Sequence, residues 1–138
     1  MKTATLRVCV PVVLAFGLLA SGLAGADTRA TQARNLAKYT PYLGEPVEDF
    51  PFWSLYKWQL VGPLSVVVWT NTKDAWLLTV ESPCTRLEWS HGIGLTSHVS
   101  HHVTRRMDAL LVGADSCRIE TIRPIDTERM KSDRAHAR

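Results

Sequence analysis

The chain has 138 residues, of which 16 are Lys or Arg and 13 are Asp or Glu, so its net charge is +3. A chain of this length predicts one domain with an apolar core. The near-neutral charge argues against nucleic-acid binding, which requires a dense basic face.

The first 26 residues have the pattern of a cleaved export signal. Lys2 and Arg7 precede an apolar run over residues 8–20, and Ala24-Gly25-Ala26 supplies the small residues of a cleavage site. The run is short for a membrane span, which needs about 20 apolar residues, so a retained anchor is the minor alternative. Asp27 stands where a lipid anchor would require cysteine. We therefore expect a periplasmic or secreted protein that is not integral to the membrane after cleavage near Ala26.

Residues 27–126 are expected to form one domain, which begins with a helix. Apolar residues recur at helical spacing from Thr28 to Tyr39, with Thr28 as the cap and Pro41 just after the end. The segment 41–46 contains two prolines and a glycine, and it therefore predicts an irregular connector.

Short runs of aromatic and β-branched residues, separated by turn-forming residues, then indicate β-strands. The polar turn Asn71–Asp74 joins two of the runs as a hairpin, with Trp69 and Trp76 in the core. Between Ile119 and Ile122 the alternation of the last strand fails once, which predicts a bulge or burial on both faces. The expected strands cover residues 50–61, 65–70, 75–81, 91–96, 109–112 and 117–125.

These strands predict a mainly β fold, a small antiparallel sheet or partly open barrel of about five or six strands with one N-terminal helix. The hairpin is expected at the centre of the sheet. Beyond it, the residues after 126 are mostly charged and surround only Met130. Residues 127–138 are therefore expected to form a flexible charged tail.

Two cysteines remain after removal of the signal, because Cys9 lies within it. In an exported chain an even pair most often forms a disulfide, so Cys84 and Cys117 are expected to be bonded. The bond would close a loop of about 34 residues, for which the chain-entropy relation gives about 3.8 kcal/mol of stabilisation. A reactive thiol or a metal ligand is the alternative, although neither cysteine lies in a C-x-x-C pair.

Four histidines close together in the sequence form a candidate metal site: His91, His98, His101 and His102. Imidazole is the commonest metal ligand and a frequent acid–base group. A strand would place His98 and His102 on one face and His101 on the other, and the spacing matches no zinc signature. Solvated or core-edge histidines are the ordinary interpretation. A metal-binding protein or metal-dependent hydrolase is the alternative function.

Catalytic motifs are not recognisable in the sequence. Gly92-Ile93-Gly94 lacks the later glycine of a dinucleotide-binding loop. Ser97, His98 and Asp108 have the residue types of a catalytic triad, but no nucleophile elbow surrounds the serine. We therefore favour a protein that is not an enzyme and takes no cofactor.

Tryptophan and arginine side chains form the candidate binding surface. The tryptophans in question flank polar residues, and aromatic side chains without a basic stripe suit a protein, peptide or glycan contact. The candidate residues are Trp53, Trp58, Trp89, Arg118 and Arg123. Separate solvated arginines are the ordinary interpretation of the last two. The predicted function is a non-enzymatic periplasmic module that binds a periplasmic protein or an envelope component.

Several short strings of the chain carry a resemblance to known sequences. They include Gly44-Glu45-Pro46-Val47, Val67-Val68-Trp69-Thr70, Ala75-Trp76-Leu77-Leu78, Ile93-Gly94-Leu95-Thr96-Ser97 and Ile122-Arg123-Pro124-Ile125-Asp126. Over residues 44–126 the chain resembles an uncharacterised proteobacterial family of small exported proteins, known only as a domain of unknown function. The resemblance implies a periplasmic setting and a structural role for both cysteines. It brings no known activity and no site residue.

Overall fold

The structure, a computed structural model, describes residues 23–138. The apolar run of the expected signal peptide, residues 8–20, lies outside the described residues. The elements in chain order are α1 (Leu23–Ala37), the 3-10 helix η1 (Thr40–Tyr42), β1 (Asp49–Pro51), β2 (Lys57–Gly62), β3 (Ser65–Trp69), β4 (Ala75–Val80), the 3-10 helix η2 (Leu87–Trp89), β5 (Gly94–Leu95), β6 (His102–Thr104), β7 (Ala109–Val112), β8 (Asp115–Ile125) and α2 (Thr127–His136).

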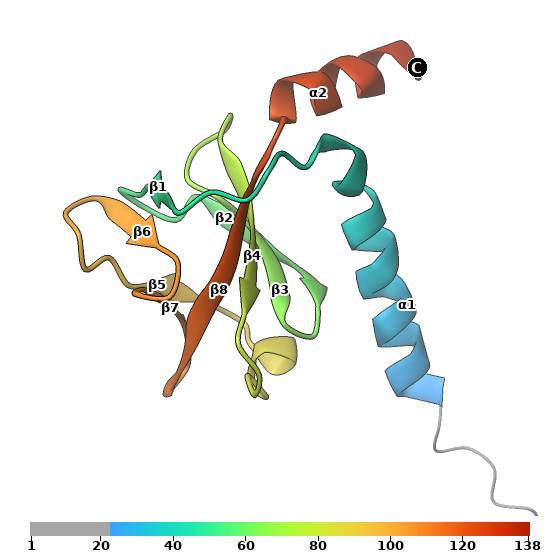
Figure 1. Ribbon diagram of the computed structural model, residues 1–138. Coiled ribbons are helices and arrows are strands. Elements are labelled where there is room, and N and C mark those ends of the chain that lie inside the picture. Colours follow the sequence, from blue (N-terminus) through green and yellow to red (C-terminus); the bar gives the residue numbers. More distant parts are fainter. Residues whose placement is uncertain (1–22) are drawn as a thin grey trace, which may run out of the picture.

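Six antiparallel strands form a curled sheet, the half-barrel at the centre of Figure 1, in the order β2-β3-β4-β8-β7-β5. A second, two-stranded sheet is made by β1 and β6, which also pair antiparallel. The hairpin of β3 and β4 occupies inner positions of the larger sheet, as predicted. The expectation of a mainly β fold, with a small antiparallel sheet and an N-terminal helix, is confirmed.

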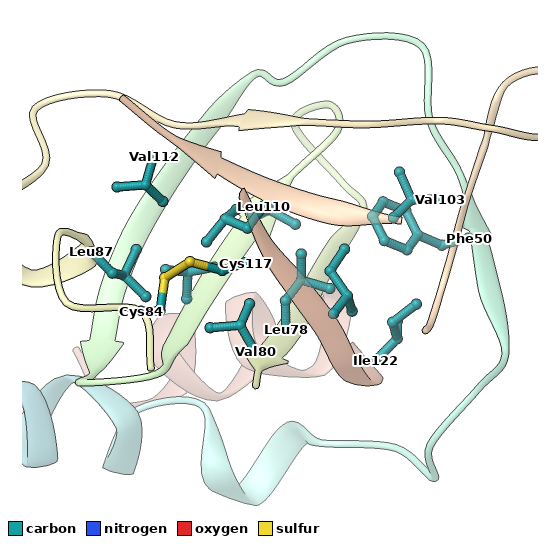
Figure 2. Close-up of a cluster of buried hydrophobic side chains, with 13 residues drawn as sticks. Phe50, Leu78, Val80, Cys84, Leu87, Val103, Leu110, Val112, Cys117 and Ile122 are labelled. Atoms are coloured by element: carbon teal, nitrogen blue, oxygen red, sulfur yellow. A yellow bond between two sulfur atoms is a disulfide. The ribbon is translucent and has the colours of Figure 1, made fainter. Parts of the chain in front are cut away.

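The main core lies between the half-barrel and the small sheet. Phe50 of β1 and Val103 of β6 are fully buried in one cluster with Leu78 of β4 and Ile122 of β8 (Figure 2). Complete burial of such side chains stabilises the fold by about 1.5–3 kcal/mol each. The small sheet is therefore held on the inner face of the half-barrel by its own apolar residues.

The predicted disulfide is present in the same core. The sulfurs of Cys84 and Cys117 are bonded, and their Cα atoms are 5.8 Å apart. Both residues are buried in the main cluster, close to Leu87 in Figure 2. The bond ties the segment after β4 to the first half of β8.

A bulge in β8 explains the interrupted alternation of the last strand. Thr79 of β4 pairs with Thr121, whereas the next residue, Val80, pairs with Ile119, so one residue of β8 has no partner in this ladder. The extra residue returns Ile122 to the side of Ile119, and both are fully buried in the main cluster. The predicted bulge is confirmed.

Helix α1 lies along the outer face of the half-barrel, which carries a second apolar cluster, and α2 lies beyond the end of β8 (Figure 1). Val67 and Trp69 of β3 point to this face, and Tyr39, just after α1, packs edge to face on the Trp69 ring with centroids 5.7 Å apart. Strand β3 is therefore buried on both faces, as its continuous apolar run predicts. Within residues 23–138, neither α-helix combines the length and apolar character that a membrane span requires.

The C-terminal segment forms α2, although the sequence predicts no regular structure there. The Asp126 carboxylate caps the helix by accepting a hydrogen bond of 2.9 Å from the Arg129 N–H. Met130 is buried on the outer face, and the Tyr42 hydroxyl donates to the Asp133 carboxylate. One capping residue and one buried methionine thus hold a helix whose other side chains are mostly charged.

Two expected elements differ in extent. The N-terminal helix begins at Leu23, so Thr28 lies inside it and is not the cap. The expected strand 91–96 shortens to the two residues of β5, while β6 was not expected. Both β5 and β6 are too short for an alternation of apolar residues to be visible in the sequence.

The expected strand 50–61 is divided between the two sheets. Its first residues form β1 and its last residues form β2, with a loop between them. The Phe52 N–H donates to the His101 carbonyl, and the Tyr56 N–H donates to the Trp69 carbonyl. The loop therefore crosses from the small sheet to the half-barrel and places Trp53 between the two.

Candidate functional site

The most exposed aromatic feature of the small sheet is Trp53, in the loop between β1 and β2. Its side chain is 75% exposed. The indole stacks on the imidazole of His101, with ring centroids 3.6 Å apart and planes 19° apart. We call this pair the Trp53–His101 stack. One face of the indole is thus covered by an imidazole, while most of the ring remains open.

The hairpin that carries His101 is held by backbone contacts. The His102 N–H donates to the Val99 carbonyl at 2.9 Å, and the Phe52 N–H donates to the His101 carbonyl at 2.8 Å. The Ser97 hydroxyl lies 2.8 Å from the Val99 carbonyl and 2.7 Å from the His102 carbonyl, and it shares its hydrogen between them. The support under the indole is therefore fixed on several sides.

Asp108 is a fully buried carboxylate that organises the base of the same hairpin. It accepts hydrogen bonds from the Thr104 N–H at 2.7 Å, the Thr96 hydroxyl at 2.8 Å and the His98 N–H at 2.9 Å. Its Oδ1 also lies 2.6 Å from Nδ1 of His98. These donors lie just after β5 and at the end of β6, so one side chain ties together the two ends of the hairpin.

The electrostatics of Asp108 follow from these contacts. Burial raises the pKa of the carboxyl, but the hydrogen bonds from the Thr104 N–H, the His98 ring, the Thr96 hydroxyl and the His98 N–H outweigh it. The pKa of Asp108 therefore lies below its ordinary value, and the carboxylate is ionised at neutral pH. Because an ionised carboxylate can only accept, the hydrogen of His98 belongs on Nδ1.

The three residues with the types of a catalytic triad are only partly assembled. His98 and Asp108 form the acid–base pair that such a triad contains. The hydroxyl of Ser97, however, is directed to the backbone carbonyls of its own hairpin. The pair therefore supports the loop, and the serine has the geometry of a turn-stabilising residue.

The four histidines of the candidate metal site do not converge. His101 stacks on Trp53, His98 contacts Asp108, and Nδ1 of His102 lies 3.2 Å from the Ser100 carbonyl. In the part of the chain that the structure describes, no three His, Cys, Asp or Glu side chains are arranged to hold a metal ion. The alternative of a metal-dependent hydrolase has no ligand set in these residues.

A cleft of about 240 Å³ lies beside Trp53, between the end of β1 and the turn that joins β3 and β4. We call it the Trp53 cleft. In the turn, Asn71 Oδ1 accepts from the N–H groups of Lys73 and Asp74, and Asn71 Nδ2 donates to Asp74 Oδ2 at 2.7 Å. The cleft is lined by Pro51, Trp53, Thr70, Asn71, Asp74 and Trp76.

Trp76 contributes an unusual polar group to this region. Its ring stacks on Phe50 at 5.0 Å between centroids, with planes 21° apart. Its indole Nε1 is buried and has no hydrogen-bond partner among residues 23–138. Buried donors are nearly always paired, so an unpaired one beside a cleft is a departure that calls for a reason.

The other candidate surface residues do not join Trp53 on one face. Trp58 is half-buried against the main core, and Arg123 donates from Nε to the Gly44 carbonyl at 2.9 Å. Arg118 is exposed on β8. Trp89 is 79% exposed but borders a different cleft, of about 390 Å³, which shares no lining residue with the Trp53 cleft. The five candidate residues therefore do not form the single aromatic and arginine face that the sequence suggests.

The sequence does not indicate Asp108 as a structural centre or Trp76 as part of a site. Residue types suggest only a triad for Asp108 and only the core for Trp76. The polar residues Thr96, His98 and Thr104, which donate hydrogen bonds to Asp108, are the sequence features that could have indicated its role. Their convergence depends on the tertiary fold, so spacing alone could not reveal it.

Comparison with known proteins gives a family but no function. Neither the curated proteins nor the solved structures contain a match to this chain. A family model matches residues 5–138, nearly the full length, and this confirms the resemblance to an uncharacterised family. The chain belongs to DUF6491, a family of unknown function.

Proposed function

We propose that the chain is a non-enzymatic exported module, which matures in a proteobacterial periplasm and binds an envelope component or periplasmic protein at the Trp53–His101 stack. The single observation that carries the proposal is the exposure of Trp53 on a rigid support. Tryptophan is strongly enriched among the residues that dominate binding energy. An aromatic side chain that is already fixed loses little conformational entropy when a ligand covers it.

The contacts below the stack favour binding over catalysis. Asp108 and His98, the pair with an acid–base geometry, are explained by their hydrogen bonds to the hairpin. Further along the same hairpin, the Phe52 N–H donates to the His101 carbonyl, and the His101 imidazole stacks on Trp53. The buried charge is thus accounted for by its support of the hairpin that carries His101.

Trp89 is the competing surface, because it is as exposed as Trp53. Within residues 23–138, however, Trp89 has no stacked aromatic neighbour. An indole without a stacked neighbour has more rotamer freedom to lose when a ligand covers it. We therefore assign binding to Trp53 and use Trp89 as the matched control.

The first experiment tests the binding surface. Immobilised protein is incubated with a solubilised cell-envelope extract of the producing organism, and the retained proteins and glycans are compared for the native chain, Trp53→Ala and Trp89→Ala. We expect the native chain and Trp89→Ala to retain the same component and Trp53→Ala to lose it. Equal retention by Trp53→Ala, or no component retained by the native chain, contradicts the proposal.

The second experiment tests export. The N-terminal signal pattern and the bond between Cys84 and Cys117 both support maturation in an oxidising compartment. Intact-mass analysis of the periplasmic fraction is expected to find a chain that begins at Asp27 and is two hydrogens lighter than its reduced form. Recovery of only the unprocessed, reduced chain from the cytosol contradicts export.

A further inference from the structure

We infer that the Trp53 cleft binds a neutral saccharide ring, an inference that rests on the proposed function and specifies the chemistry of its ligand. The cleft has a volume of about 240 Å³. Ligand pockets that enclose a drug-sized molecule are larger, at about 300–1,000 Å³. This cleft therefore suits one ring of a longer molecule, with the rest of that molecule outside.

The aromatic part of the site matches the apolar face of a sugar ring. Trp53 borders the cleft and is held from one side by the His101 imidazole. The face of an indole carries negative charge density, so it attracts the weakly positive C–H groups of a pyranose. The fixed indole provides a platform without further ordering on binding.

The polar part of the site provides acceptors for hydroxyl groups. Asp74 lines the cleft, and its Oδ2 accepts one hydrogen bond from Asn71. A carboxylate has about four acceptor positions, so others remain for a ligand. No salt bridge within residues 23–138 involves Asp74. The Asn71 turn holds the carboxylate in position, and Thr70 adds a hydroxyl beside it.

The unpaired indole N–H of Trp76 supplies the complementary donor. Trp76 lines the same cleft, and its buried Nε1 has no hydrogen-bond partner in the part of the chain that the structure describes. A ligand hydroxyl oxygen accepts from this group once the side chains that border the cleft shift to admit it. A sugar hydroxyl both donates and accepts, so it can serve Asp74 and Trp76 together.

A cationic ligand is the strongest competitor, since two tryptophans and a carboxylate also attract ammonium groups. A cation, however, has no acceptor for the Trp76 N–H. Two positive side chains also border the turn: Lys73 lies within it, and Lys131 donates from Nζ to the Thr72 carbonyl at 3.2 Å. The neutral, hydroxyl-rich ligand is therefore favoured.

The test follows the indole N–H signals of the ¹⁵N-labelled purified protein in heteronuclear NMR spectra. The chain has five tryptophans, so each indole can be assigned by substitution. The probes are cellotriose, maltotriose and tri-N-acetylchitotriose, with tetramethylammonium as the cationic competitor. We expect at least one trisaccharide to move the Trp53 and Trp76 signals, with the Trp76 proton moving downfield as it gains an acceptor, while the Trp89 signal stays unchanged.

Substitutions then assign the roles. Trp53→Ala is expected to weaken trisaccharide binding at least about tenfold, equal to about 1.4 kcal/mol. Trp76→Phe keeps a ring but removes the N–H, and Asp74→Asn keeps the shape but removes the charge, so both are expected to weaken binding. Trp89→Ala is the control and is expected to bind as the native protein does. Each variant is shown to be folded by a spectrum that matches that of the native protein away from the substituted residue.

The outcomes separate this inference from the proposed function. Shifts caused by tetramethylammonium alone overturn the saccharide assignment and leave a binding site at Trp53. Trp53-dependent capture of an envelope component, without any response to the trisaccharides, also overturns the saccharide assignment and leaves a binding site at Trp53. If the native protein shows neither the NMR shifts nor the capture, the proposed function is overturned as well. Trisaccharide shifts at Trp89 alone contradict the assignment to the Trp53 cleft.

Discussion

Among single residues, Asp108 does most to fix the hairpin that carries His101. A buried charge is destabilising unless it is fully paired, and this carboxylate meets four donors from Thr96, His98 and Thr104. The arrangement explains why a polar side chain can lie among apolar strands. It also links a buried residue to the exposed indole of Trp53, through the hairpin that carries His101.

Replacement of Asp108 by alanine is expected to lower the free energy of unfolding by about 3–5 kcal/mol, because the donors around it lose their partner inside the protein. Urea unfolding followed by tryptophan fluorescence measures the change. Asp115→Ala is the matched control: Asp115 is partly exposed and lies 3.4 Å from Arg86, so its loss is expected to change stability by less than about 1 kcal/mol. Equal effects of the two substitutions would show that Asp108 is not a structural centre.

The lowered pKa of Asp108 predicts the sign of the pH dependence. A carboxyl group with a lower pKa in the folded state stabilises the fold above its unfolded-state pKa, which is about 3.9, and this stabilisation is lost as the pH falls through the folded-state pKa. The melting temperature is therefore expected to fall below about pH 4. Asp108→Asn should show a smaller fall over that range. An identical acid profile in the two proteins contradicts the assignment.

At the scale of elements, the sequence predicts long and regular features better than short ones. The alternation in β4, the continuous apolar run of β3 and the turn between them are local signals, and all three are present in the structure. The bulge near Glu120 was visible as a break in period. Strands β5 and β6 have two and three residues, so their existence depends on pairing with distant strands.

The candidate site, too, is only partly predictable from the sequence. The sequence indicated Trp53 and Trp89 as exposed aromatic residues, because each flanks polar positions. It could not separate them from Trp58, which a strand turns toward the core. The sequence also does not predict that the turn at Asn71 lies near Trp53, because this proximity depends on how β1 lies over the half-barrel.

Helix α2 depends on a local signal, the Asp126 cap, which the mostly charged composition of the segment does not reveal. Asp126→Ala removes the cap and is expected to destabilise the helix by about 1 kcal/mol, within a range of about 0.5–2. Hydrogen exchange of the amides in residues 127–136 should accelerate about fivefold, which corresponds to about that free energy. Glu128→Ala is the control without the cap contact. Unchanged exchange in Asp126→Ala would contradict the role of the cap.

At the scale of the whole molecule, the disulfide joins the segment after β4 to β8 across the main core. Residues Cys84 and Cys117 are 33 positions apart, so the bond restricts a large part of the unfolded chain. In a domain of this size, that restriction is comparable to a large share of the net stability. Oxidation of the two cysteines therefore contributes to the stability of the fold.

The double substitution of Cys84 and Cys117 by serine is expected to lower the free energy of unfolding by about 2–5 kcal/mol. Urea unfolding of the native protein with and without reductant provides an independent comparison, and reduced native protein should resemble the double variant. A native protein that is equally stable in both states contradicts a structural role for the bond.

The central claim is that a processed, exported chain presents Trp53 to a component of the envelope. The most direct measurement is photo-cross-linking in the producing cell, with a benzophenone amino acid placed at Ser54, next to Trp53, and in a control at exposed Ser116 on β8. We predict an adduct from position 54, carried on a chain that begins at Asp27, and no such adduct from position 116. The same adducts from both positions, or adducts only on the unprocessed chain, would contradict the account.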